Sequence, residues 1–410
     1  MYNVSMVKDN ISNNSPEFPD NKENKENMAG SKSPSNSASK EPKAPAFKSF
    51  NKNGSKFPVK YAVAGICLAA VLALGLTYLF GTSGSKGITS PRSGEASKEE
   101  LRLQNPITGV MYTKDTAGPI NERPLAVMVN NHVDARPQSG LTSADVIYEI
   151  VAEGGITRFI AFYMSETPKK IGPIRSTRDY YLVLVKELGD AMVMHIGWSP
   201  QALEAIETWP VRSLGRGGAE FWRDNPRNVA TEHTAYADGE YLRKLGKELG
   251  WEGRGKFAEW QFKEDSPVAT PDTSEIAIDF WSKGDYSGIF HYDTGTNSYL
   301  RFTGYDSNDA PIPLKDQETN EQVKVKTVIV QFADETSVPG DEKNRLAYQL
   351  VGSGTGLVFM DGTVTEVTWS KEDRDARTMF YTTDGEEMVF NRGKLWISIV
   401  PSRNVLQVIY

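Results

Sequence analysis

The pattern of apolar and polar positions divides the chain into unlike parts. Residues 1–60 are rich in Asn, Ser, Lys and Pro and poor in apolar side chains. Such a segment buries too little surface to offset its ordering entropy, so it is predicted to be a disordered tail. An uncharged apolar run follows at 61–80, and Gly, Ser, Thr and Pro return at 81–120. That last stretch is predicted to be a flexible spacer.

The apolar run Tyr61–Phe80 predicts a single transmembrane helix. At about 1.5 Å per residue, a helix of this length spans a hydrocarbon core of roughly 30 Å. Lys48, Lys52, Lys56 and Lys60 precede the run with no acid between them, whereas the far flank is balanced in charge. The positive-inside rule predicts an uncleaved signal-anchor with a cytoplasmic N-terminus and an extracellular body. A cleaved signal peptide and a buried helix are the alternatives.

Strand and helix patterns alternate over 121–266, which predicts an α/β domain with a mixed sheet. Gly154-Gly155 suits a tight hairpin between two of its strands. Strands are expected at 124–130, 145–153, 157–164 and 191–196, and helices at 173–188, 200–208 and 239–249. Residues 267–410 contain short strand-like runs separated by turns such as Asp361-Gly362 and Asp384-Gly385. They predict a β-rich domain, either a sandwich or a partly closed barrel.

Charge and cysteine content narrow the choice of function. Residues 101–410 carry 33 Lys and Arg against 44 Asp and Glu, and this acidic balance argues against a nucleic-acid partner. The one cysteine, Cys67, lies in the apolar run, so the body has no disulfide and no thiol nucleophile. Ile66 precedes Cys67 where a lipid-acceptor cysteine needs a small residue, and this favours a helical anchor over a lipid.

Arginines gather around the predicted helix start at 173–188. A helix N-terminus attracts anions, and guanidinium groups match carboxylate or phosphate oxygens as a fork. Arg175 and Arg178 are spaced to project from one side of a first turn. The predicted ligand-binding residues are Arg136, Arg158, Arg175, Arg178, Ser176, His195, Trp198 and His233. Structural ion pairs with Glu149, Glu153 or Asp179 are the alternative, equally open, interpretation.

Candidate catalytic groups are Glu149, Glu153 and His195. On one strand the two glutamates would lie about 13 Å apart, wider than a glycosidase pair, unless Glu153 curls into the glycine turn. Pairing of Glu153 with Arg158 across the hairpin is the more ordinary role. His195 ends a predicted strand and suits either a ligand contact or a satisfied core position. The histidine spacings match no zinc motif, so no metal or cofactor is predicted.

Several motifs in order resemble the YerB-like lipoprotein family of Gram-positive bacteria. They include Arg136–Leu141, Glu153–Arg158, Gly172–Arg178, His195 with Ser199-Pro200, and Gly393–Ile397. The resemblance spans about 120–410 and implies paired N- and C-terminal domains of unknown function in the cell envelope. It implies no established activity, and the anchor of this chain departs from the family's.

The sequence therefore predicts a single-pass, extracytoplasmic protein of the cell envelope. Its partners are expected to be the membrane and either a cell-wall component or another envelope protein. The leading hypothesis is binding of an anionic wall glycan or peptide carboxylate through an arginine-lined cleft. An envelope hydrolase using Glu149 or Glu153 with His195 is the second hypothesis, and a scaffold that recruits cell-wall enzymes is the third.

Overall fold

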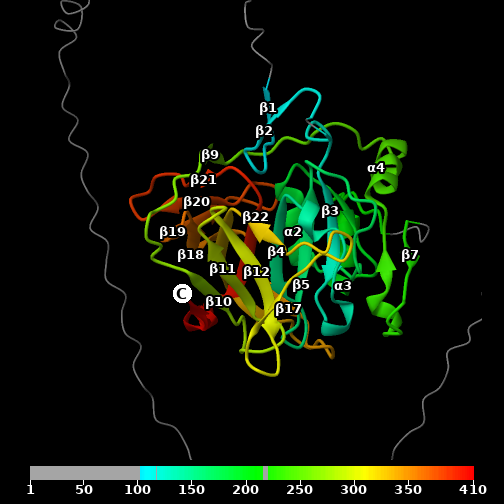
Figure 1. The fold of residues 1–410 in the computed structure, drawn as a ribbon. Coiled ribbons are helices and arrows are strands. Elements are labelled where there is room, and N and C mark those ends of the chain that lie inside the picture. The colour runs from blue at the N-terminus through cyan, green and yellow to red at the C-terminus, as the bar shows by residue number, and fades with distance from the viewer. Residues whose placement is uncertain (1–101, 117, 216–219) are drawn as a thin grey trace, which may run out of the picture. The chain divides into compact units, whose positions relative to one another are not determined.

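A computed structural model describes residues 102–116, 118–215 and 220–410 (Figure 1). The predicted tail at 1–60 and the predicted transmembrane helix at 61–80 lie outside the described residues. Within the described ranges, no helix combines the length and the apolar character needed to cross a membrane.

A nine-stranded mixed sheet forms the centre of the described chain (Figure 1). From edge to edge its strands are β20 (Met379–Thr382), β19 (Thr363–Lys371), β18 (Gly352–Met360), β15 (Thr327–Ala333), β22 (Leu395–Pro401), β4 (Val146–Val151), β5 (Thr157–Tyr163), β3 (Leu125–Asn130) and β6 (Met192–Met194). β15–β22, β22–β4 and β3–β6 are parallel pairs, and the others are antiparallel. β3, β4 and β5 are buried at every residue, which fits their nearly continuous apolar sequences because both faces of the sheet are covered.

Helices cover one face of this sheet. α2 (Asp179–Glu187) and α3 (Pro200–Thr208) join a buried cluster with alternate residues of β4 and β5, such as Ile150 and Ile160. Tyr181 fixes α2 to the sheet, because its hydroxyl donates to the carbonyl oxygen of Ile150 at 3.0 Å. This anchoring places the start of α2 beside the turn that joins β4 to β5.

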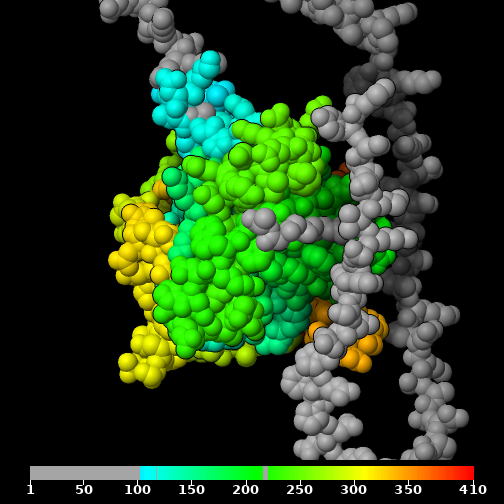
Figure 2. Space-filling view, turned by 90° about the vertical axis from the view of Figure 1, so that its right-hand side faces the viewer, coloured from blue at the N-terminus to red at the C-terminus, as the bar shows by residue number. Residues whose placement is uncertain are grey.

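A six-stranded sheet covers the other face. It comprises, in order, β13 (Pro311–Pro313), β12 (Ser298–Tyr305), β11 (Gly288–Asp293), β10 (Glu275–Ile278) and β23 (Val408–Ile409), with β14 (Lys324–Val325) also paired to β12. Its apolar side chains share a second buried cluster with the remaining residues of β4 and β5. α4 (Gly239–Glu248) contributes Leu242 to that cluster, and in Figure 2 the green part of the chain covers much of the face turned to the viewer.

Short elements complete the described chain. They are β1 (Arg102–Gln104), β2 (Met111–Thr113), η1 (Val133–Ala135), η2 (Leu141–Ser143), β7 (Trp222–Arg223), η3 (Thr231–His233), β8 (Ala235–Tyr236), β9 (Gln261–Lys263), β16 (Glu335–Ser337), β17 (Leu346–Tyr348), β21 (Val389–Asn391) and η4 (Ser402–Gln407). β1 and β2 form a hairpin, and Ile107 between them is fully buried. The prediction of an irregular spacer over 81–120 is therefore wrong from residue 102 onward, because this stretch packs on the core.

The mixed sheet and the β-rich character of 267–410 are confirmed, but the strands of 267–410 do not form a sandwich or barrel apart from the first part of the chain. β15, β18, β19, β20 and β22 extend the sheet that β3–β6 begin, and Leu395 of β22 pairs in parallel with Val146 of β4. One sheet therefore runs across the predicted boundary at 266/267. Composition along the chain marks a change of pattern there but carries no information about which strands pair. The domain division itself stays a prediction.

The helix predicted at 173–188 begins later than expected, at Asp179. Residues 173–178 are extended because their backbone pairs with neighbouring segments: the amide of Ile174 donates to Ala235 and that of Arg175 to Met128. Arg175 and Arg178 therefore do not share a first helical turn, and the predicted helix-terminus anion site is wrong. α3 and α4 lie as predicted, and Ser199 caps α3 by accepting a hydrogen bond from the Ala202 amide at 3.1 Å.

Candidate functional site

Glu153 holds two of the predicted arginines on the helix-covered face of the central sheet. The carboxylate contacts Arg158 at 2.9 Å and Arg178 at 2.5 Å. Burial opposes ionisation of Glu153, but the hydrogen bond from Arg178 and the charges of both arginines outweigh it, so its pKa is lowered. Glu153 lies beyond the end of β4, in the turn where the sequence allowed it to curl. Its contact with Arg158 is the cross-hairpin pair that the sequence favoured.

Ser176 joins the same two arginines. Its hydroxyl oxygen accepts from Arg158 Nη1 at 3.2 Å and from Arg178 Nη1 at 3.1 Å. Both arginine residues are nearly buried, at 8% and 7% exposure. Burial, and next the charge of Arg178, lower the pKa of Arg158. Ser176, Arg158, Arg178 and Glu153 therefore form an internally paired network.

Arg175 is placed differently from these two. Its side chain is 31% exposed, and its ion pair with Glu232 is long, at 3.9 Å. Burial lowers the pKa of Arg175, while Glu232 opposes that shift. Arg175 and Glu232 line a pocket of about 250 Å³ together with Ile174, Ile196, Arg223, Thr231 and Ala235. Two guanidinium groups, Arg175 and Arg223, therefore border one small open space.

Arg223 is the member of this pocket that sequence reasoning missed. It lies on β7, and its Nη1 donates to the carbonyl oxygen of Thr231 and, at 3.2 Å, to the Thr234 hydroxyl. These bonds hold the side chain over the pocket through Nη1, so the other donors of its guanidinium can bind a ligand. Its position after Phe221 and Trp222 was visible in the sequence, but nothing local shows that β7 approaches Arg175.

Glu149 lies on the opposite face of the central sheet. It is fully buried and forms an ion pair with Arg301 of β12 at 2.7 Å, and Arg301 is fully buried as well. Trp396 Nε1 and the Thr157 hydroxyl also donate to the Glu149 carboxylate, at 3.1 and 2.8 Å. The sheet thus separates Glu149 from Glu153. The two glutamates do not form a catalytic pair, and Glu149 acts as a core anion between the two sheets.

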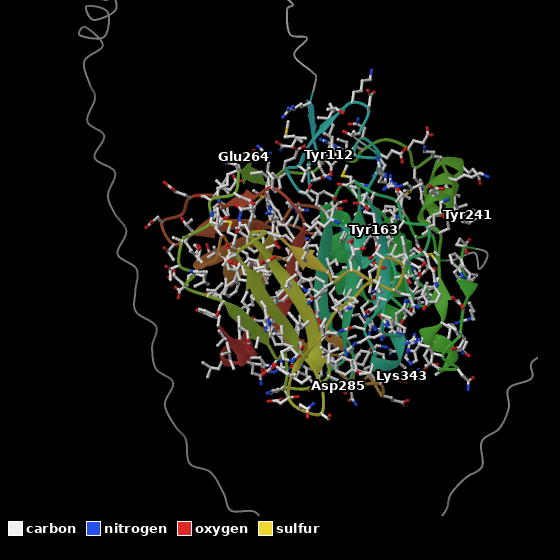
Figure 3. All side chains as sticks on the ribbon, in the orientation of Figure 1. Tyr112, Tyr163, Tyr241, Glu264, Asp285 and Lys343 are labelled. Carbon is white, nitrogen blue, oxygen red and sulfur yellow. The ribbon has the colours of Figure 1, made fainter. Side chains whose placement is uncertain are left out.

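Arg136 also lies away from the other arginines. Its guanidinium donates to the carbonyl oxygen of Asn131 at 3.0 Å and to that of Asp285 at 2.7 Å. Asp285 is labelled at the lower end of the molecule in Figure 3. Burial lowers the pKa of Arg136 to about 10. Arg136 lines a separate pocket of about 470 Å³ with Lys315, so it does not contribute to the Arg175 pocket.

His195 is a satisfied core histidine. It is fully buried, and its Nδ1 lies 3.0 Å from the Gly197 carbonyl oxygen and its Nε2 2.8 Å from the Ser213 hydroxyl. Both ring nitrogens are therefore occupied, which leaves neither for acid–base work on a substrate. Trp198 packs edge-on against His195 but stays 38% exposed, beside the extended segment that carries Arg175.

His233 follows Thr231 and Glu232, which line the Arg175 pocket. It is 5% exposed, and its Nδ1 lies 2.8 Å from the Asn130 side-chain nitrogen. The His132 ring stacks on it with centroids 4.4 Å apart. Burial, followed by the charges of His132 and Arg175, lowers the pKa of His233. His132, Asp134 and His233 form a group whose ligand atoms all lie within 4.8 Å of one another.

The predicted site residues thus form three groups, one of which is the His195–Trp198 pair, and two separate positions. Glu153, Arg158, Arg178 and Ser176 form one network, and Arg175 and His233 lie together next to it. Glu149 and Arg136 lie elsewhere. The residues that sequence reasoning missed are Arg223, Glu232, His132, Asp134 and Arg301. Glu232, His132 and Arg301 each contact a partner that is distant in sequence.

The chain is similar to known proteins over both of its parts. The family profile described as "Protein of unknown function (DUF3048) N-terminal domain" matches residues 107–252, and that of the "DUF3048 C-terminal domain" matches 276–397. A protein of Bacillus subtilis (strain 168) named "Putative lipoprotein YerB" is 30% identical over 311 residues, which are 75% of this chain and 89% of that protein. The crystal structure of YerB protein from Bacillus subtilis matches with a TM-score of 0.62 at 29% identity, covering 75% of this chain and 99% of that one.

Proposed function

Because the chain belongs to the DUF3048 family, a family of unknown function, we propose its function from the site. We propose an extracytoplasmic protein of the cell envelope that binds a small anionic group in the Arg175 pocket. The name of the B. subtilis relative supports the envelope location. The observation that carries the binding proposal is the placement of Arg175 and Arg223 on one pocket, with Arg175 only loosely paired.

The size of the pocket defines the ligand. Its volume of about 250 Å³ is below the range of roughly 300–1,000 Å³ that drug-sized ligands occupy. It suits a single carboxylate-sized group rather than a whole glycan. Guanidinium donors form a planar fork that matches two carboxylate oxygens. We therefore assign the pocket to a terminal carboxylate, such as the one that ends a cell-wall peptide, with the rest of the ligand lying outside.

Charge favours this assignment. Around the pocket, Arg158, Arg175 and Arg178 face Glu153 and Glu232, and Arg223 adds a further positive group. Among these paired groups four arginines face two glutamates, although the body of the chain is acidic. A carboxylate would therefore be attracted to this position and repelled by most of the remaining surface. The exposed ring of Trp198 lies nearby and offers an apolar surface to the attached part of the ligand.

The membrane anchor is a second part of the proposal. We place a single transmembrane helix at Tyr61–Phe80, with the body outside the cell. The name of the relative suggests a lipid on a cysteine instead, and Cys67 is the one cysteine available. Cys67→Ser separates the two anchors. The helix predicts that the variant stays in the membrane fraction without any change in mass beyond the substitution, whereas a lipid anchor predicts release and loss of incorporated fatty acid.

Sedimentation of the purified full chain with isolated cell wall tests the binding proposal. Arg175→Ala with Arg223→Ala should lower the bound fraction, because it removes both guanidinium groups of the pocket. Arg254→Ala is the matched control, since Arg254 is a surface arginine in a 2.7 Å ion pair with Glu259. Equal binding by the double variant, the control and the unaltered chain would refute the proposed site.

A further inference from the structure

Beside the Arg175 pocket, three side chains of metal-ligating type converge. They are His132, Asp134 and His233, and the ligand atoms of all three lie within 4.8 Å of one another. His132 precedes η1 and Asp134 lies within it, whereas His233 ends η3 in a distant part of the chain. The fold therefore assembles a two-histidine, one-carboxylate group that no spacing in the sequence indicates.

Asn130 supports both histidines. Its side chain is 2% exposed, and its oxygen accepts from the His132 backbone amide at 3.0 Å. Its nitrogen lies 2.8 Å from His233 Nδ1 and 3.4 Å from the carbonyl oxygen of Glu232. One buried amide thus fixes the two segments that carry the histidines. Metal-binding histidines are usually oriented by such a partner on the second ring nitrogen.

The distances admit a small divalent ion once the His132 ring turns out of its stack on His233 and its Nδ1 gives up the hydrogen bond that it accepts from the Asp134 amide at 3.2 Å. His132 Nδ1 lies 3.6 Å from Asp134 Oδ2. Two ligands at the usual zinc distances of about 2.0–2.2 Å, arranged tetrahedrally, are roughly 3.4 Å apart. The side chains of His132 and Asp134 are 30% and 53% exposed, so both can move toward the buried His233 ring.

We propose that His132, Asp134 and His233 bind a transition-metal ion of the zinc class. Imidazole nitrogen with one carboxylate oxygen is a donor set that such ions take, and three protein ligands leave a coordination position open to water or a ligand. This site goes beyond the proposed carboxylate pocket and does not depend on it. Glu232 contributes negative charge nearby and offsets Arg175, with which it is paired.

Titration of the purified full chain with Co²⁺ and Zn²⁺ tests the site. We expect one Co²⁺ per chain with visible absorption of low-symmetry nitrogen–oxygen coordination, and displacement of Co²⁺ by Zn²⁺. Loss of a residue that only hydrogen-bonds a metal ligand typically lowers metal affinity about 10- to 100-fold. His132→Asn and Asp134→Asn each remove a ligand itself, so each should lower Co²⁺ affinity by at least that factor. Both residues are partly exposed, so these two variants keep the test valid where His233→Asn impairs folding.

His291→Asn is the matched control. His291 Nε2 lies 3.2 Å from Glu275, which makes it a histidine–carboxylate contact outside the proposed site. Unchanged Co²⁺ binding in His291→Asn together with weakened binding in the His132 and Asp134 variants supports the proposal. Equal affinity in all of these variants, or no spectrum at millimolar Co²⁺, overturns it.

Discussion

Removing Arg301 should destabilise the fold strongly, because its partner Glu149 would remain buried without a countercharge. Arg301 and Glu149 are both fully buried and contact at 2.7 Å between the two sheets. Breaking such a pair by removing one partner costs about 3–5 kcal/mol, a large part of a typical stability of roughly 5–15 kcal/mol. The guanidinium also lies 4.9 Å from the Phe290 ring and 4.7 Å from the Trp396 ring, and Arg301→Met loses these contacts as well.

Urea unfolding of the full chain, followed by tryptophan fluorescence, measures this cost. Glu149→Leu combined with Arg301→Met should be less destabilised than the sum of the two single variants, since no buried charge then lacks a partner. Arg254→Met provides the contrast, because its ion pair with Glu259 has the same 2.7 Å separation but is exposed, so it should cost less than about 1 kcal/mol. If Arg301→Met costs no more than Arg254→Met, Glu149 is not a structural anion.

Three further predictions concern stability. The lowered pKa of Glu153 gives stability that is present above its unfolded pKa and lost as pH falls through the lower folded value, so Glu153→Gln should flatten the acid limb of a stability–pH curve. Gly362→Ala should destabilise the fold more than Gly385→Ala in urea unfolding. Both glycines have positive φ, so an alanine at either position is strained by about 1–2 kcal/mol. In addition, a Cβ at Gly362 would lie 2.8 Å from the Tyr292 ring, whereas a Cβ at Gly385 would have no neighbour within 4 Å. Ser199→Ala should cost about 1 kcal/mol in thermal unfolding, whereas Ser199→Asp should retain the cap of α3.

Local features of the fold were predictable because they depend on neighbouring residues. The Asp361-Gly362 turn joins β18 to β19 as expected, since both residues adopt the positive φ that a tight hairpin needs. The limits of α3 follow from its Ser199 cap and the proline after it. In contrast, the parallel pairing of β22 with β4 joins strands far apart in sequence, and no period or turn specifies it.

The candidate site was predictable in composition but not in arrangement. The sequence predicts a helix from residue 173, yet the backbone of 173–178 pairs with other segments, so tertiary hydrogen bonds take precedence over local propensity. Glu149 and Glu153 are equivalent in sequence, since both are acids in one apolar run. In the structure Glu149 pairs with Arg301 on one face of the central sheet, and Glu153 pairs with Arg158 on the other. Arg301 lies 152 residues from Glu149, so nothing near Glu149 identifies its partner.

The most direct test of the Arg175 pocket is calorimetric titration of the full chain with a short peptide that ends in a free carboxylate and with the same peptide as its amide. We predict that the carboxylate form binds at least tenfold more tightly, which corresponds to about 1.4 kcal/mol, and that Arg175→Lys removes most of this preference because it keeps the charge and loses the fork. Equal affinity for the two peptides, or a preference unchanged by Arg175→Lys, would contradict the account.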